Sequence, residues 1–218
     1  MNRTLFIFAV TACIAKSSLA QSHQPGTLSF QASVDLGVHG TVYHSEDGGI
    51  VLANDTSSAA TTLFSLSAQY QLNNWLSVGV NGRTGVYHED PENAEEAGNH
   101  IRTLSADLRL YPVNKENFNW YLGVDYGIAA LEINRNYVFI VPFTAEYDLS
   151  GSHLGLFTGF NWYFLDFAGI HMNLAYSRHA FDLKHYYLSG QEQDLGSSIN
   201  TLDALGVHFQ AGLSFRIN

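Results

Sequence analysis

The strongest constraint on the fold is a period-two alternation of apolar and polar side chains that recurs along the chain. The stretch ADLRLYPVNKENFNWYLGVDYG, residues 106–127, shows this alternation twice, on either side of a short polar turn. A side-chain period of two indicates a β-strand with one apolar and one polar face. Two such strands joined by a few turn residues predict an antiparallel β-hairpin.

Eight segments carry this alternation, and we expect each of them to form one strand. They span residues 27–44, 61–72, 75–88, 100–112, 118–131, 152–163, 168–181 and 204–217. The connections between them alternate in length: 73–74, 113–117 and 165–167 are short, whereas 45–60, 89–99, 132–150 and 183–203 are long and polar. In an up-and-down arrangement, all the short turns therefore lie at one end and all the long loops at the other.

The first twenty residues are predicted to be a signal peptide that is cleaved from the mature protein. A basic start at Arg3, an apolar run over 5–15 and the small-residue site 18–20 predict cleavage before Gln21. The alternative is a lipoprotein signal with the lipid on Cys13. In either case the chain leaves the cytoplasm, and we expect residues 21–218 to form a single domain.

The mature chain is expected to fold without a disulfide, because its single cysteine lies in the leader. Beyond the leader, no apolar run approaches the ~18 residues that a membrane-spanning helix requires. Lysine occurs only at positions 16, 115 and 184, whereas the wet face of a soluble β-protein normally carries many more. This shortage is a first indication that no strand face meets water.

Two closed barrels fit the alternation, and the polar face distinguishes them. A soluble lipocalin-like barrel turns its apolar face inward around a ligand, whereas a membrane barrel turns it outward to lipid. The polar face here is rich in Gly, Ser and Asn and carries three acids and three bases, as expected of a narrow interior that neutralises its own charges. The six charged residues of this predicted lumen network are Asp35, Arg83, Asp107, Arg109, Asp125 and Arg216.

The charged residues of the apolar face lie at one end of the predicted strands: they are Arg102 and Arg178, both near the long-loop side. A cation there costs little, whereas at the bilayer midplane it costs ~2–4 kcal/mol. Aromatic residues gather on the same face near the short-turn side, as in an interfacial girdle: Tyr70, Trp120, Phe160, Trp162 and Phe215. We therefore predict an all-β fold, an eight-stranded antiparallel up-and-down transmembrane β-barrel with short periplasmic turns and long extracellular loops.

The sequence resembles the small eight-stranded bacterial outer-membrane barrels, namely the OmpA-like transmembrane domain and the OmpX/Ail and opacity-protein groups. LRLYPVNKENFNWYLGVDYG is similar to the hairpin between the fourth and fifth strands of those barrels. The last strand, 210–217, is similar to the terminal signal read by the barrel-insertion machinery, although Ile217 stands where an aromatic residue is usual. The resemblance implies a place in the outer membrane, contact with lipid and lipopolysaccharide, and periplasmic chaperones and the insertion machinery as partners.

Two readings of the lumen charges stay open: a salt-bridged plug that stiffens the interior, and a gate in a narrow ion path. Four histidines also point inward, on strands that would be contiguous: His39, His153, His179 and His208. Imidazoles gathered at one level can bind a transition metal or respond to pH, and they are also ordinary lumen residues. No cofactor is predicted.

The long connections hold fifteen acidic residues in or beside them, against Arg135 and Lys184. Such loops can bind a surface ligand or divalent cations, and they disfavour nucleic acid. Ser177 and His179, two apart on one strand, suggest a lipid-modifying hydrolase as an alternative. We predict a non-enzymatic outer-membrane barrel with a structural or surface-interaction role, in adhesion or envelope integrity, and a largely plugged polar lumen. The alternatives are a narrow ion channel or porin, the hydrolase, and the soluble lipocalin-like barrel.

Overall fold

The computed structural model describes residues 23–89, 95–138, 142–196 and 198–217, so the predicted signal peptide and Cys13 lie outside the described residues. Eight long strands form one antiparallel ring in the order β10-β1-β2-β3-β5-β6-β7-β8, and β8 pairs with β10 to close it. Their bounds are β1 Leu28–Asp47, β2 Ile50–Asn73, β3 Leu76–Glu89, β5 His100–Lys115, β6 Phe118–Tyr137, β7 Phe143–Tyr163, β8 Ala168–Leu188 and β10 Ile199–Ile217. In the described part of the chain, no helix is long and apolar enough to cross a bilayer.

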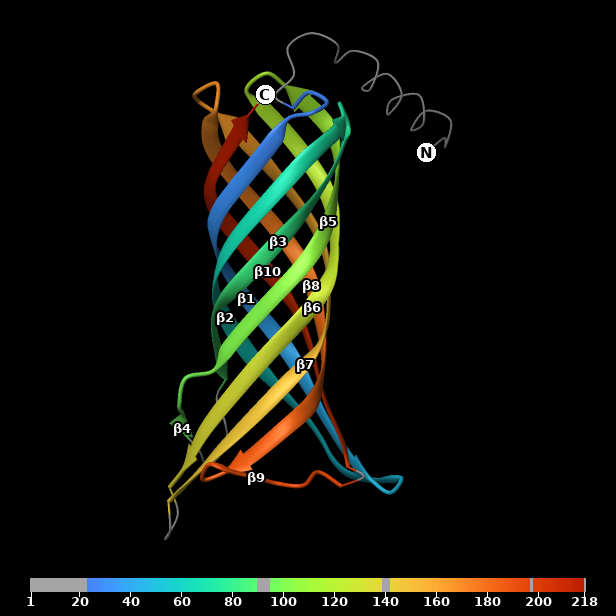
Figure 1. Cartoon of the computed structure of the whole chain (residues 1–218), viewed down its shortest axis with the longest axis vertical. Helices are drawn as coiled ribbons and strands as arrows, with labels where there is room; N and C mark the ends of the chain where they lie inside the picture. Colours follow the sequence, from blue (N-terminus) through green and yellow to red (C-terminus); the bar gives the residue numbers. More distant parts are fainter. Residues whose placement is uncertain (1–22, 90–94, 139–141, 197, 218) are drawn as a thin grey trace.

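The predicted eight-stranded up-and-down barrel is confirmed. The short turns and the C-terminus lie at one end of the barrel, and long hairpins project from the other (Figure 1). Two short strands lie at the hairpin end: β4, Glu95–Glu96, pairs with β6, and β9, Gln191–Glu192, pairs with β8.

The predicted long loop 89–99 is confirmed between β3 and β5, but the bounds of the other three long loops are wrong, because the strands run on through much of those segments. β1 and β2 stay paired up to Asp47 and Ile50, and Gly48 and Gly49 make the turn with φ of 56° and 84°. β6 and β7 likewise stay paired up to Tyr137 and Phe143. Backbone hydrogen bonding does not depend on which side chains are apolar, so a hairpin in water can continue after the alternation has faded. The outer end of the barrel is thus built of extended hairpins.

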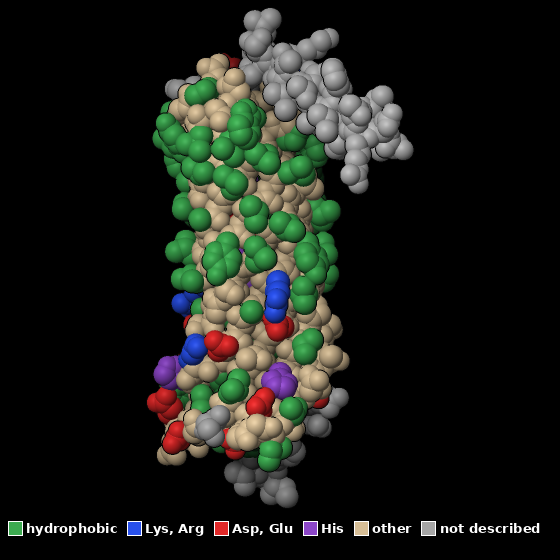
Figure 2. Space-filling view, turned by 90° about the vertical axis from the view of Figure 1, so that its right-hand side faces the viewer, with side chains coloured by type: hydrophobic (Ala, Val, Ile, Leu, Met, Phe, Trp, Pro, Cys, Tyr) green, Lys and Arg blue, Asp and Glu red, His purple; other side chains and the backbone are tan. Residues whose placement is uncertain are grey.

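The apolar face points outward along the barrel. On β1, Val34 and Leu36 are each 53% exposed, whereas Asp35 between them is 2% exposed. The space-filling view shows apolar side chains over the upper part of the barrel and charged groups gathered toward the hairpin end (Figure 2). The soluble lipocalin-like alternative is therefore wrong, since it requires this face to point inward.

Two outward-facing ion pairs mark the outer edge of the apolar band. Arg102 lies 3.3 Å from Glu132, and Arg178 lies 2.8 Å from Asp203. At the opposite end, aromatic side chains expected in the girdle lie on the exterior, with Trp162 56% exposed. The band between aromatic residues and ion pairs is the surface that meets hydrocarbon.

The interior changes character along the barrel axis. Near the short turns it holds Arg109 among aromatic rings, and its middle holds paired charges and histidines. In the outer half, the prediction of a polar interior is wrong. Ten buried apolar side chains form one cluster there: Ala59, Leu63, Tyr87, Ile101, Ala129, Leu131, Ile133, Leu149, Phe181 and Leu202.

Candidate functional site

Near the short turns, the interior is closed by one buried ion pair. Arg109 Nη2 donates to Asp107 Oδ2 at 3.1 Å, and Arg109 Nη1 donates to Gln31 Oε1 at 2.8 Å. Asp107 also accepts a hydrogen bond from Gln69. The guanidinium lies over the ring of Tyr121, 4.9 Å from its centroid. This layer joins β1, β2, β5 and β6 across the bore.

The middle layer contains two carboxylates and one guanidinium. Arg83 Nη2 donates to Asp125 Oδ2 at 2.8 Å, and Arg83 Nε lies 4.0 Å from Asp35 Oδ2. Asp125 Oδ2 also accepts from Ser105 Oγ at 3.2 Å and lies 3.0 Å from His153 Nε2. These side chains are at most a few per cent exposed, so each carboxylate relies on protein partners rather than on water.

Arg216 lies apart from these two layers, at the short-turn end. Its guanidinium donates to the backbone oxygens of Asp166 and Glu116, at 2.6 and 2.9 Å. It also covers the ring of Tyr163 at 4.2 Å. Of the six predicted network residues, the structure therefore brings together Asp107 with Arg109, and Asp35 with Arg83 and Asp125.

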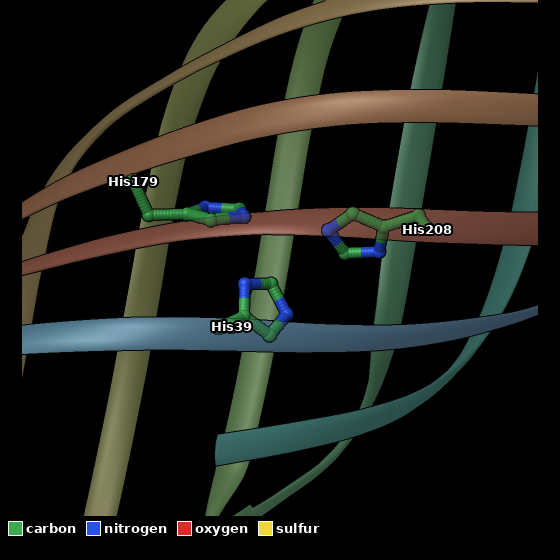
Figure 3. Close-up of side chains that lie close together, drawn as sticks. All are labelled: His39, His179 and His208. Atoms are coloured by element: carbon green, nitrogen blue, oxygen red, sulfur yellow. The ribbon is translucent and has the colours of Figure 1, made fainter. Parts of the chain in front are cut away.

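Three of the four predicted histidines meet in the bore. His39 on β1, His179 on β8 and His208 on β10 offer ring nitrogens that all lie within 4.8 Å of one another (Figure 3). The ring centroids of His39 and His208 are 4.7 Å apart. His153 faces His179 at 4.6 Å, but its Nε2 is directed to Asp125.

The strand register explains how two of these rings fit side by side. His39 is paired with Gly206, and His208 with Gly37, so each imidazole lies over a residue without a side chain. A Cβ added at Gly37 would lie 2.6 Å from His208 Nδ1, and one at Gly206 would meet His39 Nδ1. Glycine at both positions is therefore required for the rings to meet.

The histidines are unevenly hydrogen bonded. His208 Nδ1 lies 2.9 Å from Asp35 Oδ1, and His39 Nε2 lies 3.1 Å from Thr61 Oγ1. Among the described residues, His39 Nδ1 and both ring nitrogens of His179 have no hydrogen-bond partner, although all are buried. A buried polar atom without a hydrogen-bond partner lowers the stability of the folded protein by about 1–3 kcal/mol.

The sequence suggested a pair of Ser177 with His179. In the structure, Ser177 is hydrogen bonded to His208 instead. Its Oγ lies 2.7 Å from His208 Nε2, and His208 Nδ1 is bonded to Asp35. This is the serine–histidine–carboxylate order of many hydrolases. The three residues are buried, however, and the apolar cluster lies between them and the hairpin end.

The outer mouth of the barrel contains a cavity of about 490 Å³. Its apolar lining includes Ile133, Leu149 and Leu202, which also belong to the apolar cluster. At its charged side, Arg135 Nε donates to Glu89 Oε1 at 2.8 Å. This cavity was not predicted, because most of its lining residues come from segments that had been expected to be loops.

Tyr147 also lines the cavity, and its ring lies under the guanidinium of Arg135 at 5.5 Å. Burial raises the pKa of the Tyr147 hydroxyl well above its ordinary value, and a hydrogen bond with Tyr137 acts in the same direction. The phenol therefore stays neutral as a hydrogen-bonding group of the cavity wall.

A closed antiparallel barrel with an apolar exterior and a polar middle is an outer-membrane β-barrel. No family model matches the chain, and no curated protein matches it. Among solved structures, the chain is similar to the outer membrane protein OprG from Pseudomonas aeruginosa, with 13% identity, a TM-score of 0.64, and coverage of 91% of this chain and 99% of OprG. It is also similar to the outer membrane protein AlkL, with 11% identity, a TM-score of 0.57, and coverage of 90% and 92%. At these identities the likeness concerns the fold, and it confirms the predicted class of small outer-membrane barrels.

Proposed function

We propose that this protein is a non-conducting outer-membrane barrel that interacts with its surroundings through its outer end. The observation that carries the proposal is the stack of filled layers along the bore. The Arg109–Asp107 layer, the Arg83–Asp125 layer and the apolar cluster follow one another along the bore, and their side chains are buried. Eight strands enclose little more than the space that side chains fill. The narrow-channel alternative is therefore less well supported.

The outer end supplies the surfaces for interaction. Beyond the ion pair of Arg178 and Asp203, the β1–β2 hairpin continues to a tip where Ile50, Val51 and Leu52 are 57–68% exposed. Apolar side chains exposed together at a hairpin tip favour contact with an apolar partner. The mouth cavity adds a second site, suited to a small ligand with both apolar and polar groups.

Two measurements test this proposal. Purified protein reconstituted in planar bilayers is expected to give no unitary current, and a steady wild-type current would refute the closed bore. Cells that display the barrel are expected to adhere to alkyl-coated beads, and the triple variant Ile50→Ser, Val51→Ser, Leu52→Ser should adhere less at equal surface levels. The variant Asn54→Ser, Thr56→Ser serves as the matched polar control on the same hairpin.

Further partners follow from the place of the barrel in the envelope. Arg102 and Arg178 lie on the exterior at the outer edge of the apolar band, where they suit the phosphates of lipopolysaccharide. The chaperones and the insertion machinery that act on the unfolded chain complete the set of proposed partners.

A hydrolase is the second candidate, and the bonded set of Ser177, His208 and Asp35 is the observation that favours it. Its burial beneath the apolar cluster argues against turnover of a lipid. Mass analysis of lipid A from cells with and without the protein decides the matter. An unchanged pattern removes this candidate, and a loss of acyl chains that disappears in Ser177→Ala would establish it.

A further inference from the structure

We propose that His39, His179 and His208 form a binding site for one divalent transition-metal ion inside the barrel. This inference goes beyond the surface role proposed above and does not depend on it. The site would tie β1, β8 and β10 together at the seam where the first and last strands close the ring.

The spacing of the three rings suits a single ion. Their nitrogens lie within 4.8 Å of one another. Three ligands at ~2.0–2.1 Å from a tetrahedral ion lie ~3.3 Å apart, so the nitrogens would have to approach by about 1.5 Å at most. Small rotations of imidazole side chains provide such a movement. Figure 3 shows that each ring turns a nitrogen toward the space between the three.

The hydrogen bonds around the rings place nitrogen lone pairs where an ion would need them. Asp35 accepts the proton of His208 Nδ1, so the lone pair of that ring is on Nε2. Thr61 Oγ1 can accept the proton of His39 Nε2 in the same way, and His39 Nδ1 then carries a lone pair that no described residue uses. A carboxylate or hydroxyl that holds the far nitrogen of a histidine is the usual outer partner of a metal-bound imidazole.

His179 provides the strongest single indication. It is 1% exposed, and within the described residues neither of its ring nitrogens has a hydrogen-bond partner. A bound ion would satisfy one of these nitrogens and also His39 Nδ1. Ser177, whose hydroxyl is bonded to His208 Nε2, lies where it can give way to the ion or complete its coordination.

The charge of the middle layer favours a cation. Of the described arginines and lysines, only Arg83 faces Asp35 and Asp125, whose other partners are His208, His153 and Ser105. With the histidines neutral, the two carboxylates and one guanidinium leave one negative charge uncompensated in a buried layer. Neutral imidazoles select zinc, copper, nickel, cobalt or iron over magnesium and calcium, which prefer oxygen ligands. The expected occupant is thus an ion such as Zn²⁺, and Co²⁺ is a suitable spectroscopic probe.

The test uses the untagged mature chain folded into detergent in the presence of Co²⁺ or Zn²⁺, so that the closed bore does not hinder entry. Folding is verified for every sample by the band shift on boiling. The wild type is expected to retain one metal ion per chain after dialysis and to show visible Co²⁺ bands of a nitrogen-rich tetrahedral site. Mg²⁺ should not compete.

The variants distinguish the site from the other histidines. His39→Ala and His179→Ala should each abolish stoichiometric binding, whereas His171→Ala should retain it, since His171 is a buried lumen histidine outside the cluster. Asp35→Asn should weaken binding by about 10–100-fold, as expected of a positioning residue. Ser177→Ala should retain the ion, which separates this site from hydrolase chemistry.

Two outcomes would overturn the inference. One is folded wild-type barrel that retains no metal after dialysis. The other is binding that His39→Ala and His179→Ala leave unchanged, which would place the ion on exposed histidines. A bound ion should also raise the urea concentration needed for unfolding in the wild type and in His171→Ala, but not in His179→Ala.

Discussion

Replacement of Arg83 by alanine should destabilise the barrel by roughly 3–5 kcal/mol, because it leaves buried carboxylates without their cation. The Arg83 side chain is 4% exposed, and it lies 2.8 Å from Asp125 and 4.0 Å from Asp35. Asp125 would keep Ser105 and His153, and Asp35 would keep His208, but no other described arginine or lysine reaches the layer.

Arg178 provides the matched control for this magnitude. Its ion pair with Asp203 has the same 2.8 Å distance, but the two side chains are 55% and 38% exposed. Water and salt screen such a pair, so Arg178→Ala should cost no more than ~1 kcal/mol. The two variants lose the same type of charge and differ in burial.

Reversible unfolding by urea in detergent or lipid vesicles, followed by tryptophan fluorescence, measures both free energies. A change of 3–5 kcal/mol corresponds to a drop of roughly two to four powers of ten in the folding equilibrium constant. The double variant Arg83→Ala, Asp125→Asn should recover part of the loss, because it removes one of the stranded charges. A double-mutant cycle then gives the coupling energy between the two side chains.

Equal losses in Arg83→Ala and Arg178→Ala would refute this reasoning. So would a double variant that is destabilised by the full sum of the two single changes at Arg83 and Asp125. Either result would mean that the middle layer is hydrated and that the bore is not closed by it.

Three further predictions concern orientation, packing and pH. A spin label at Val78 should be reached by oxygen dissolved in the acyl chains, whereas one at Asn81 should not. The opposite result would mean that the polar face, and not the apolar face, meets lipid. Gly206→Ala should cost about 1–3 kcal/mol in urea unfolding because its Cβ meets an imidazole and a backbone oxygen, whereas Gly82→Ala, with open space around the added Cβ, should be nearly neutral. The pKa of Tyr147 is higher in the folded than in the unfolded protein, so its contribution to stability is complete below the unfolded-state pKa of ~10 and is lost as the pH rises toward the folded-state pKa. Tyr147→Phe should therefore reduce the loss of stability at alkaline pH.

The alternation along the sequence was sufficient to predict the eight strands, their order and the face that meets lipid. It also placed each of the six charged residues and four histidines in the interior. These inferences succeed because a period of two assigns every strand residue to one face, and one apolar exterior fixes the assignment for the whole barrel. The extent of the hairpins escaped prediction, because the interior face that is polar in the middle of the barrel turns apolar in the outer half, and the alternation that marked the strands is lost there.

Contacts across the bore were decided by the tertiary structure. Asp35, Ser177 and His208 meet because β1 closes against β10, and β10 in turn pairs with β8. Likewise, the two ion pairs of Arg83 and Arg109 with Asp125 and Asp107 are seen only in the closed barrel. Sequence assigns a residue to a face, but its height and its neighbours depend on strand tilt and on the stagger between strands, which exist only once the sheet has closed.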